Sequence, residues 1–188
     1  FNGICLVHRA EILQVHGQWP EAVAEAQRAY RRLVDSPEHE GAAAACYQEG
    51  EIARLRGDTS AAEQHYREAS RWGWDPQPGL ALLRLAQGRT EEAVAAIRRV
   101  VGTSSDPLLR SRLLPAYADI AIVAGALDEA REAAAELERT AEQFATEILG
   151  AMAAQARGSV LLTEGDSWAA APLLRRAFSV WQHVGAPY

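Results

Sequence analysis

The chain of 188 residues contains no lysine, and all 19 of its basic residues are arginine. Schiff-base catalysis and Walker A phosphate binding both need a lysine ammonium group, so the sequence excludes both. Asparagine occurs once, as Asn2, and methionine once, as Met152. Because Met152 is internal, the sequence lacks an initiator methionine, and we expect a fragment or a processed product of a longer protein.

Cysteines and long apolar runs are also scarce. Two cysteines, Cys5 and Cys46, cannot form a disulfide framework, and their apolar, helical context predicts buried thiols in a reducing compartment. No apolar run approaches the roughly 18 residues that span a bilayer. The first residues lack the positively charged segment followed by an apolar one that a signal peptide carries. We therefore expect a cytoplasmic protein that makes no membrane contact.

An excess of positive charge is missing as well. The net charge is −6, and arginine and glutamate residues are interspersed along the chain. Proteins that bind nucleic acid through its phosphates usually show a basic excess or a basic stripe. We expect no direct nucleic-acid contact by this segment.

Patterns that carry catalysis or metal binding are absent too. Neither G-x-S-x-G nor G-x-G-x-x-G occurs, and no acid, base and nucleophile assemble in one motif. Cys5 and His8 could share a helix face, but a zinc site takes about four ligands. We expect no catalytic residue, no metal ion and no cofactor, so an enzyme stays open only as a third alternative.

Residues that favour helices are abundant. Alanine, leucine, arginine, glutamate and glutamine dominate the composition, and strand-like alternation is missing. Apolar residues recur at helical spacing, as in Leu109, Leu113, Leu114 and Tyr117. The sequence therefore predicts an all-α fold.

A pattern built around a glycine occurs five times. Each glycine is followed five residues later by alanine, with further apolar or small positions four and seven residues beyond, and each is preceded by a small residue seven positions earlier. The turn glycines are Gly17, Gly57, Gly88, Gly125 and Gly165, and the preceding small residues are Ala10, Gly50, Ala81, Ala118 and Gly158.

The physical meaning of this pattern is a helical hairpin. Glycine ends a helix in the left-handed conformation without a Cβ penalty. The oxygens of Asp58, Thr59, Asp128, Asp166 or Ser167 can then cap the second helix. Because each hairpin has one apolar side that it cannot bury alone, the hairpins are expected to stack on their neighbours.

These units resemble the tetratricopeptide repeat (TPR), and "CYQEGEIARLRGDTSAAEQHYREA" shows the pattern best. The resemblance implies an all-α, right-handed superhelix of about five TPR-like hairpins. It implies one domain over residues 1–188, with units at roughly 3–35, 40–73, 78–102, 107–141 and 144–184. The turn glycines are 40, 31, 37 and 40 residues apart, whereas the family repeats every 34 residues.

Four segments are similar to repeat regions of actinobacterial LuxR-type (MalT-like) transcription regulators: "CLVHRAEILQVHG", "RWGWDPQPGLALLRLAQGR", "AAIRRV" and "LLRRAFSVWQHVGAPY". Such regulators often place a helical-repeat region before a C-terminal helix-turn-helix. The resemblance implies a sensing or partner-binding region. The alternative is an autonomous TPR adaptor that assembles other proteins and has no role in transcription.

The TPR resemblance also implies a concave groove lined by the first helix of each hairpin. A protein, a peptide or a small ligand is the expected occupant. Glu11, Glu51 and Asp119 fall at the same place in three units, which predicts an acidic stripe for a cationic ligand, or else solvated charges near arginine residues. The candidate groove residues are His8, Glu11, Gln14, Tyr47, Glu51, Arg54, Leu82, Leu85, Arg112, Asp119 and Gln155.

The segment "RWGWDPQPG" interrupts the third unit. Trp72 continues an apolar helix side, Gly73 suits a left-handed cap, and Trp74 is expected to fold back over the joint. Pro76 and Pro78 stop the helix, and Pro78 can be the first residue of a next helix of about ten residues. We interpret the segment as a joint first, and Trp72 and Trp74 as a candidate ligand notch.

The remaining tryptophans lie near turns or near the C-terminal end. Trp19 and Trp168 follow turn glycines and are expected to fill gaps between units. Trp181, together with Phe178 and Val184, gives the last helix an apolar face. That face predicts a homodimer contact through the C-terminal helix.

Overall fold

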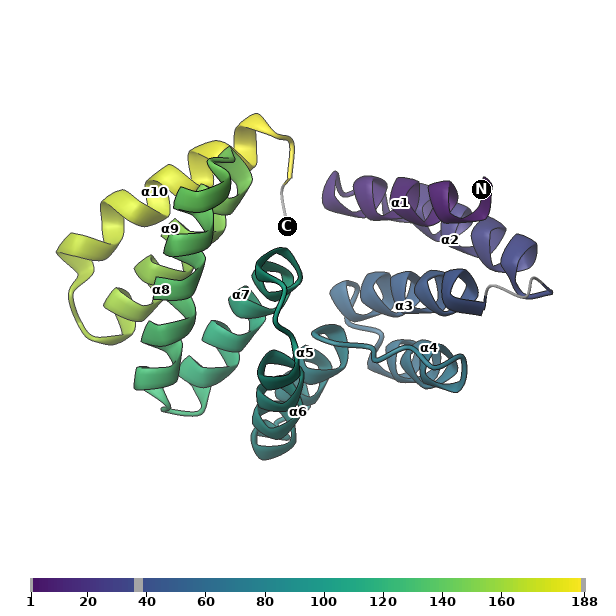
Figure 1. Ribbon diagram of the computed structural model, residues 1–188, viewed down its shortest axis with the longest axis horizontal. Coiled ribbons are helices and arrows are strands. Elements are labelled where there is room, and N and C mark those ends of the chain that lie inside the picture. The colour runs from purple at the N-terminus through teal and green to yellow at the C-terminus, as the bar shows by residue number, and fades with distance from the viewer. Residues whose placement is uncertain (1, 36–38, 187–188) are drawn as a thin grey trace. The chain divides into compact units, whose positions relative to one another are not determined.

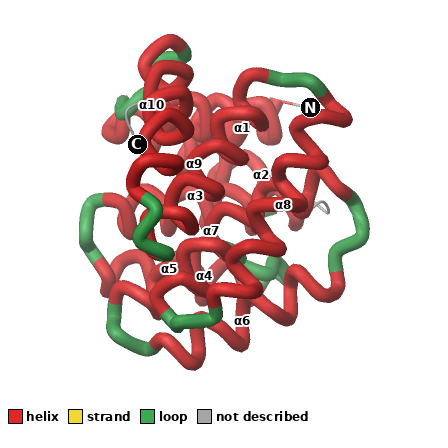
Figure 2. The backbone as a smooth tube through the Cα atoms, turned by 90° about the vertical axis from the view of Figure 1, so that its left-hand side faces the viewer, coloured by secondary structure: helices red, strands yellow, loops and turns green. Residues whose placement is uncertain are grey.

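The computed structural model describes residues 2–35 and 39–186, which form ten α-helices and no strand (Figures 1 and 2). The prediction of an all-α fold is confirmed, and the helices pack consecutively along the chain. The helices are α1 (Asn2–Val15), α2 (Trp19–Leu33), α3 (His39–Leu55), α4 (Thr59–Arg71), α5 (Gly79–Ala86), α6 (Thr90–Thr103), α7 (Pro107–Val123), α8 (Leu127–Phe144), α9 (Glu147–Thr163) and α10 (Ser167–His183).

The chain divides into two compact units. Unit 1 comprises residues 1–83 and 185–188, and unit 2 comprises residues 84–184, so that α5 contributes to both. In unit 1, α2 packs against α1 and α3, and α3 packs against α4. In unit 2, α7 packs against α6, α8 and α9, and α9 packs against α8 and α10. A single superhelix over residues 1–188 stays a prediction.

All five turn glycines adopt the predicted left-handed conformation, with φ between +74° and +89°. Each closes a Schellman motif. In one of them, the N–H of Gly57 donates to the carbonyl of Arg54 at 3.0 Å, and the N–H of Asp58 donates to Ala53 at 2.9 Å. These bonds satisfy carbonyls that a helix end leaves without a partner inside the helix. The predicted helix ends at these glycines are therefore confirmed.

The small residues before the turns lie where two helices approach closely. Ala10, Ala81 and Ala118 are completely buried. A Cβ atom on Gly50 would lie 2.6 Å from Cε1 of Tyr66, and one on Gly158 would lie 2.7 Å from Cδ2 of Leu174. The second helix of each of these hairpins therefore occupies the space that a larger side chain would need.

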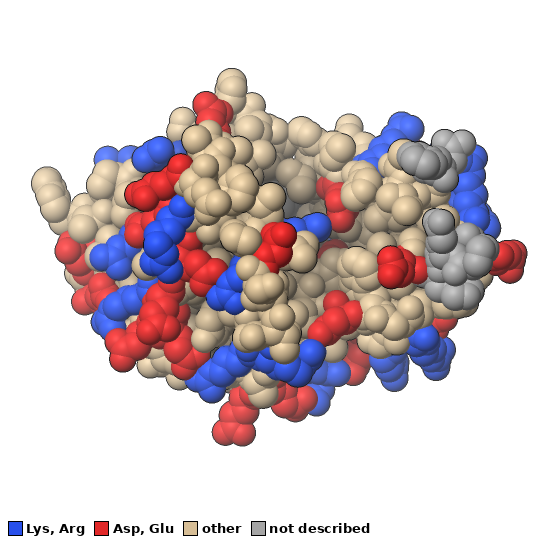
Figure 3. Space-filling view, viewed as in Figure 1, with Lys and Arg blue, Asp and Glu red and all other residues tan. Residues whose placement is uncertain are grey.

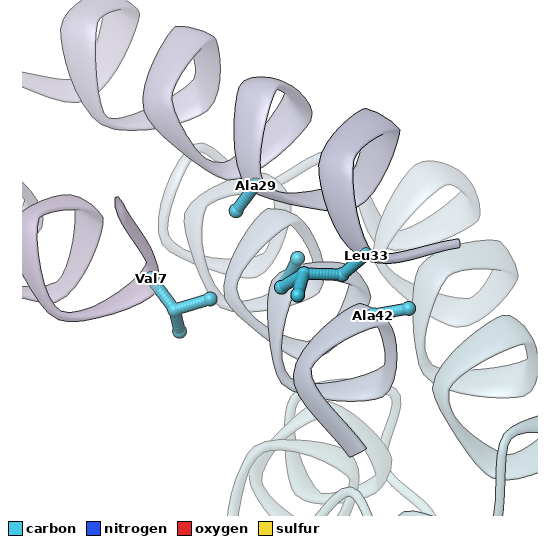
Figure 4. Close-up of a cluster of buried hydrophobic side chains, with 5 residues drawn as sticks. Val7, Ala29, Leu33 and Ala42 are labelled. Carbon is cyan, nitrogen blue, oxygen red and sulfur yellow. The ribbon is translucent and has the colours of Figure 1, made fainter. Parts of the chain in front are cut away.

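Alanine-rich cores hold each unit together. In unit 1, Val7 of α1 and Leu33 of α2 meet alanines of α2 and α3 (Figure 4). In unit 2, Leu173 and Trp181 of α10 pack on the alanines of α9 and α10. Small side chains let helices approach closely, which maximises dispersion contacts between them. The buried members of these two clusters are Val7, Ala29, Leu33, Ala42 and Ala45 in unit 1, and Ala151, Ala154 and Ala177 in unit 2.

Only some of the predicted helix caps form. Asp58 and Asp166 each accept a hydrogen bond from the backbone N–H three residues further on, at 3.0 and 2.9 Å. Thr59 and Ser167 are the first residues inside α4 and α10, so they do not cap. Asp128 lies in the first turn of α8 and pairs with Arg131 instead. The cap falls on the residue directly after the turn glycine, which before α8 is an alanine.

Asp166→Ala should therefore lower the free energy of unfolding by about 1 kcal/mol, because an N–H of α10 loses its capping oxygen. Asp128→Ala removes the same carboxylate from a site that does not cap, and should cost at most about 0.5 kcal/mol. Urea unfolding followed by circular dichroism measures both. Equal losses would contradict the assignment of Asp166 as the cap of α10.

Two predictions of burial, those for Cys5 and Trp168, are wrong. Cys46 is buried, but Cys5 is exposed, because Val7 and Ala10 face the core from the other side of α1. Trp168 is 91% exposed and fills no gap. Trp19 is half-buried, as a gap-filling residue would be.

The residues of the apolar face predicted for the last helix differ in burial. Phe178 is 62% exposed, whereas Trp181 is half-buried and donates its indole N–H to Oε1 of Gln155 at 2.9 Å. A homodimer through this helix stays a prediction. None of the helices in the described part of the chain is both long enough and apolar enough to cross a lipid bilayer.

Candidate functional site

Three predicted groove residues of α3 meet in unit 1, but their chemistry differs from the prediction. Glu51 is buried, and its Oε2 accepts a hydrogen bond from Nη2 of Arg54 at 2.8 Å. Its Oε1 accepts from Nε of Arg54 at 3.2 Å and from the hydroxyl of Tyr66. We call Glu51, Arg54 and Tyr66 the Glu51 cluster. Tyr47 flanks it, with its ring centroid 5.8 Å from that of Tyr66.

The environment of the Glu51 cluster raises the pKa values of both partners of Glu51. Burial, and then the charge of Glu51, raise the pKa of Tyr66, so its hydroxyl stays a donor. Burial alone would lower the pKa of Arg54, but its hydrogen bonds to Glu51 and the charge of Glu51 raise it overall. Both carboxylate oxygens of Glu51 already accept hydrogen bonds inside the protein. Glu51 of α3 thus links α3 to α4 through its hydrogen bond from Tyr66. It is therefore not part of the acidic stripe that was predicted to bind a cationic ligand.

The other groove residues of unit 1 lie along α1 and α5. Nδ1 of His8 lies 3.3 Å from Oε2 of Glu11 on the surface of α1. The side-chain oxygen of Gln14 accepts a hydrogen bond from the amide of Gln48, which joins α1 to α3. Leu82 lies in the part of α5 that belongs to unit 1, and it is half-buried.

In unit 2 three of the predicted groove residues lie on α7 and α9, two helices that pack against each other. The α7–α9 face consists of Leu108, Arg112 and Asp119 of α7, with Ile148, Gln155 and Leu162 of α9, each set at the three-, four- or seven-residue spacing of one helix side. Leu108, Ile148 and Leu162 are 47, 46 and 54% exposed. Asp119 is exposed, although nearby protein atoms displace part of its hydration and raise its pKa. Leu85, the remaining groove candidate, is half-buried in α5.

The tryptophan segment forms the predicted joint. Gly73 has φ +84°, and the N–H of Trp74 donates to the carbonyl of Ala69 at 3.1 Å, as in the other Schellman turns. The ring centroid of Trp74 lies 6.2 Å from that of Tyr47. Trp72 instead lies close to the hydroxyl of Tyr30 in α2 and lowers the pKa of that hydroxyl, although burial raises it overall. The two indoles of the predicted notch therefore have separate neighbours.

The helix after the joint is shorter than predicted. It begins at Gly79 rather than at Pro78, and it has 8 residues. The side-chain oxygen of Gln77 accepts from the N–H of Ala81 at 3.1 Å, a cap that the sequence analysis missed. A Cβ atom on Gly79 would lie 1.8 Å from Oε1 of Glu51, so the start of α5 rests directly on the Glu51 cluster.

A cleft in unit 1 was not foreseen from the sequence. It lies between α2 and α4, with α3 as its floor, and it consists of two lobes of about 450 and 320 Å³ that share Glu49 and His65. The larger lobe is lined by Tyr30, Cys46, Glu49, Gln64, His65, Arg67, Glu68 and Arg71. We call the two lobes together the α2–α4 cleft. Helical periodicity places Cys46 and Glu49 on a different side of α3 from Tyr47 and Glu51.

Unit 2 has a larger hollow where α8 ends and α9 begins. Its volume is about 690 Å³, and Glu138, Glu142, Glu147 and Arg176 surround a floor of small residues. On the face drawn in Figure 3, arginines and acidic residues are interspersed rather than separated into patches. Among the described residues, no three histidine, cysteine, aspartate or glutamate side chains are grouped so that they could hold a metal ion.

Comparison with known proteins assigns no function to these sites. No family model matches the sequence, and no curated protein matches it. The similarity to TPR units and to LuxR-type regulators thus depends on the sequence segments quoted above.

Proposed function

We propose that this chain is a non-enzymatic, TPR-like helical-repeat region that binds a protein or peptide and acts as the sensing region of a LuxR-type transcription regulator. The observation that supports the proposal is that successive hairpins share the same two features. Each has a left-handed glycine at its turn and a small buried residue seven positions earlier. Stacked hairpins of this kind form extended binding surfaces, and a right-handed superhelix of five such hairpins is part of the proposal.

The α7–α9 face is the surface that we assign to the partner. Its exposed leucine and isoleucine side chains can anchor apolar residues of a peptide, while Asp119 of the same face can orient polar groups. Binding there would act on a DNA-binding domain only if the partner has different affinities for two packings of the hairpins.

Binding at the α7–α9 face is tested by selecting displayed peptides against the purified chain. Leu162→Asp should weaken the selected peptides at least tenfold, because it places a charge at an apolar anchor. Trp168→Asp makes the same kind of change at an exposed apolar residue of α10 and should leave affinity unchanged. If Leu162→Asp binds as tightly as the parent chain, the α7–α9 face is not the binding surface.

The regulatory part of the proposal has a separate test. Reading the coding sequence beyond Tyr188 should reveal a helix-turn-helix. A stop codon at that point would contradict the regulator hypothesis and would favour an autonomous TPR adaptor.

A further inference from the structure

The α2–α4 cleft is a polar space of unit 1 between three helices. Both α2 and α4 pack against α3, and the space that remains between them is the cleft. Its larger lobe, of about 450 Å³, has the volume of small-molecule sites, which range from about 300 to 1,000 Å³. Residues from three helices line this lobe, so a small ligand can be contacted from several sides.

Glu49 is the central charged group of the cleft, since it lines both lobes. Its one hydrogen bond among the described residues is a long one, from Nε2 of Gln27 to Oε2 at 3.4 Å. Burial raises the pKa of Glu49, and the opposing effects of His65, Gln27 and Arg31 do not compensate for the lost hydration. A half-buried carboxylate with one weak donor gains free energy when a charged donor reaches it.

The rim of the same lobe carries positive charge. Arg71 pairs with Glu68 at 2.7 Å, whereas Arg67 forms no ion pair with any residue that the structure describes. An unpaired guanidinium binds a carboxylate through two parallel hydrogen bonds. The lobe therefore presents an acidic floor and a basic rim to one ligand.

A metal ion does not suit this lobe. Burial raises the pKa of the Cys46 thiol to about 12, and metals bind cysteine as the thiolate. Glu49, His65 and Glu68 also line the lobe, but no three histidine, cysteine, aspartate or glutamate side chains of the described residues are grouped so that they could hold a metal ion.

We propose that the α2–α4 cleft binds a basic amino acid, with its side-chain guanidinium or ammonium group on Glu49 and its α-carboxylate on Arg67. The site is separate from the α7–α9 face, which belongs to the other unit. It gives the chain a small-molecule ligand in addition to a protein or peptide partner.

Isothermal titration with L-arginine and L-lysine tests the proposal directly on the unmodified chain. We expect at least one of them to bind, and binding at least tenfold weaker for the corresponding neutral analogue, citrulline or norleucine, which keeps the α-carboxylate but lacks the side-chain charge. Agmatine or cadaverine, which lacks the carboxylate, should also bind at least tenfold more weakly. If neither amino acid binds at millimolar concentration, or if the neutral analogue binds equally well, the proposal is wrong.

Two variants test whether the ligand binds in the cleft. Glu49→Gln and Arg67→Gln should each reduce affinity at least tenfold, while the matched controls Glu91→Gln on α6 and Arg175→Gln on α10 should not, since both lie in unit 2. Thermal unfolding checks that each variant is folded, and if Glu49→Gln is not, the neutral-analogue comparison still decides. Unchanged affinity in a folded Glu49→Gln variant would overturn the proposal. A blocked peptide with an internal arginine that binds better than the free amino acid would point to a peptide ligand instead.

The outcome is independent of the proposed function. Leu162→Asp, which should weaken peptide binding at least tenfold, should leave the titration with the amino acid unchanged. Loss of both activities in that variant would indicate a folding defect rather than two sites.

Discussion

Replacing Glu51 with alanine should lower the free energy of unfolding by about 3–5 kcal/mol. The side chains of Glu51 and Arg54 are only 12 and 18% exposed, so the variant leaves a largely buried guanidinium without its counter-charge. The hydroxyl of the buried Tyr66 loses its acceptor at the same time. Urea unfolding at neutral pH, monitored by circular dichroism, measures the loss.

An exposed ion pair provides the control. Arg89 and Glu92 have the same three-residue spacing, but their side chains are 43 and 53% exposed. Glu92→Ala should therefore cost only about 0.5 kcal/mol, because solvent screens the pair. Equal losses in the two alanine variants would show that burial of the Glu51 cluster contributes nothing.

A double variant separates the charge from the packing. Leucine at both position 51 and position 54 removes the ion pair without leaving one charge alone. We expect it to be more stable than Glu51→Leu by itself, since a buried pair is often no better than apolar side chains of similar volume. A double variant that loses the sum of the two single losses would contradict this account.

Gly50→Ala should lower the free energy of unfolding by about 1–3 kcal/mol, although alanine is the better helix former. The added methyl group would lie 2.6 and 2.7 Å from two ring carbons of Tyr66. The ring is 1% exposed, and its hydroxyl is bonded to Glu51, so it has no free space into which to move. Thermal unfolding should show a lower midpoint.

Gly102 is the matched control for Gly50, because it also lies in a helix, α6, and a Cβ atom there would have nothing within 4 Å apart from its own stretch of helix. Gly102→Ala should raise the free energy of unfolding by about 0.5 kcal/mol through helix propensity alone. If both variants gain stability, the close approach of α3 and α4 at Gly50 is not tight in solution.

The features that the sequence predicts well are local. Gly57 ends α3 through hydrogen bonds that reach back only a few residues, so its neighbours along the chain determine the helix end. The small residue at Gly50 is also visible from the sequence, because its distance to the turn glycine is the same in every hairpin. Helix propensity and turn chemistry agree at these positions, and the structure follows both.

The features that the sequence does not predict depend on how separate helices meet. Glu51 stands at a groove position by spacing, yet it is buried because Tyr66 and Gly79 approach it from two other segments. Trp168 follows a turn glycine as Trp19 does, yet one is exposed and the other half-buried. The α2–α4 cleft consists of space between helices, for which a single sequence carries no periodic signal.

The Schellman turns also bear on the kinetics of folding. Every hydrogen bond that closes such a turn joins residues at most five positions apart, as Asp58 and Ala53 are. A hairpin whose reversal is specified so locally loses little loop-closure entropy before its two helices meet. Any of these hairpins can therefore serve as the nucleus on which its neighbours condense, and low contact order favours rapid folding.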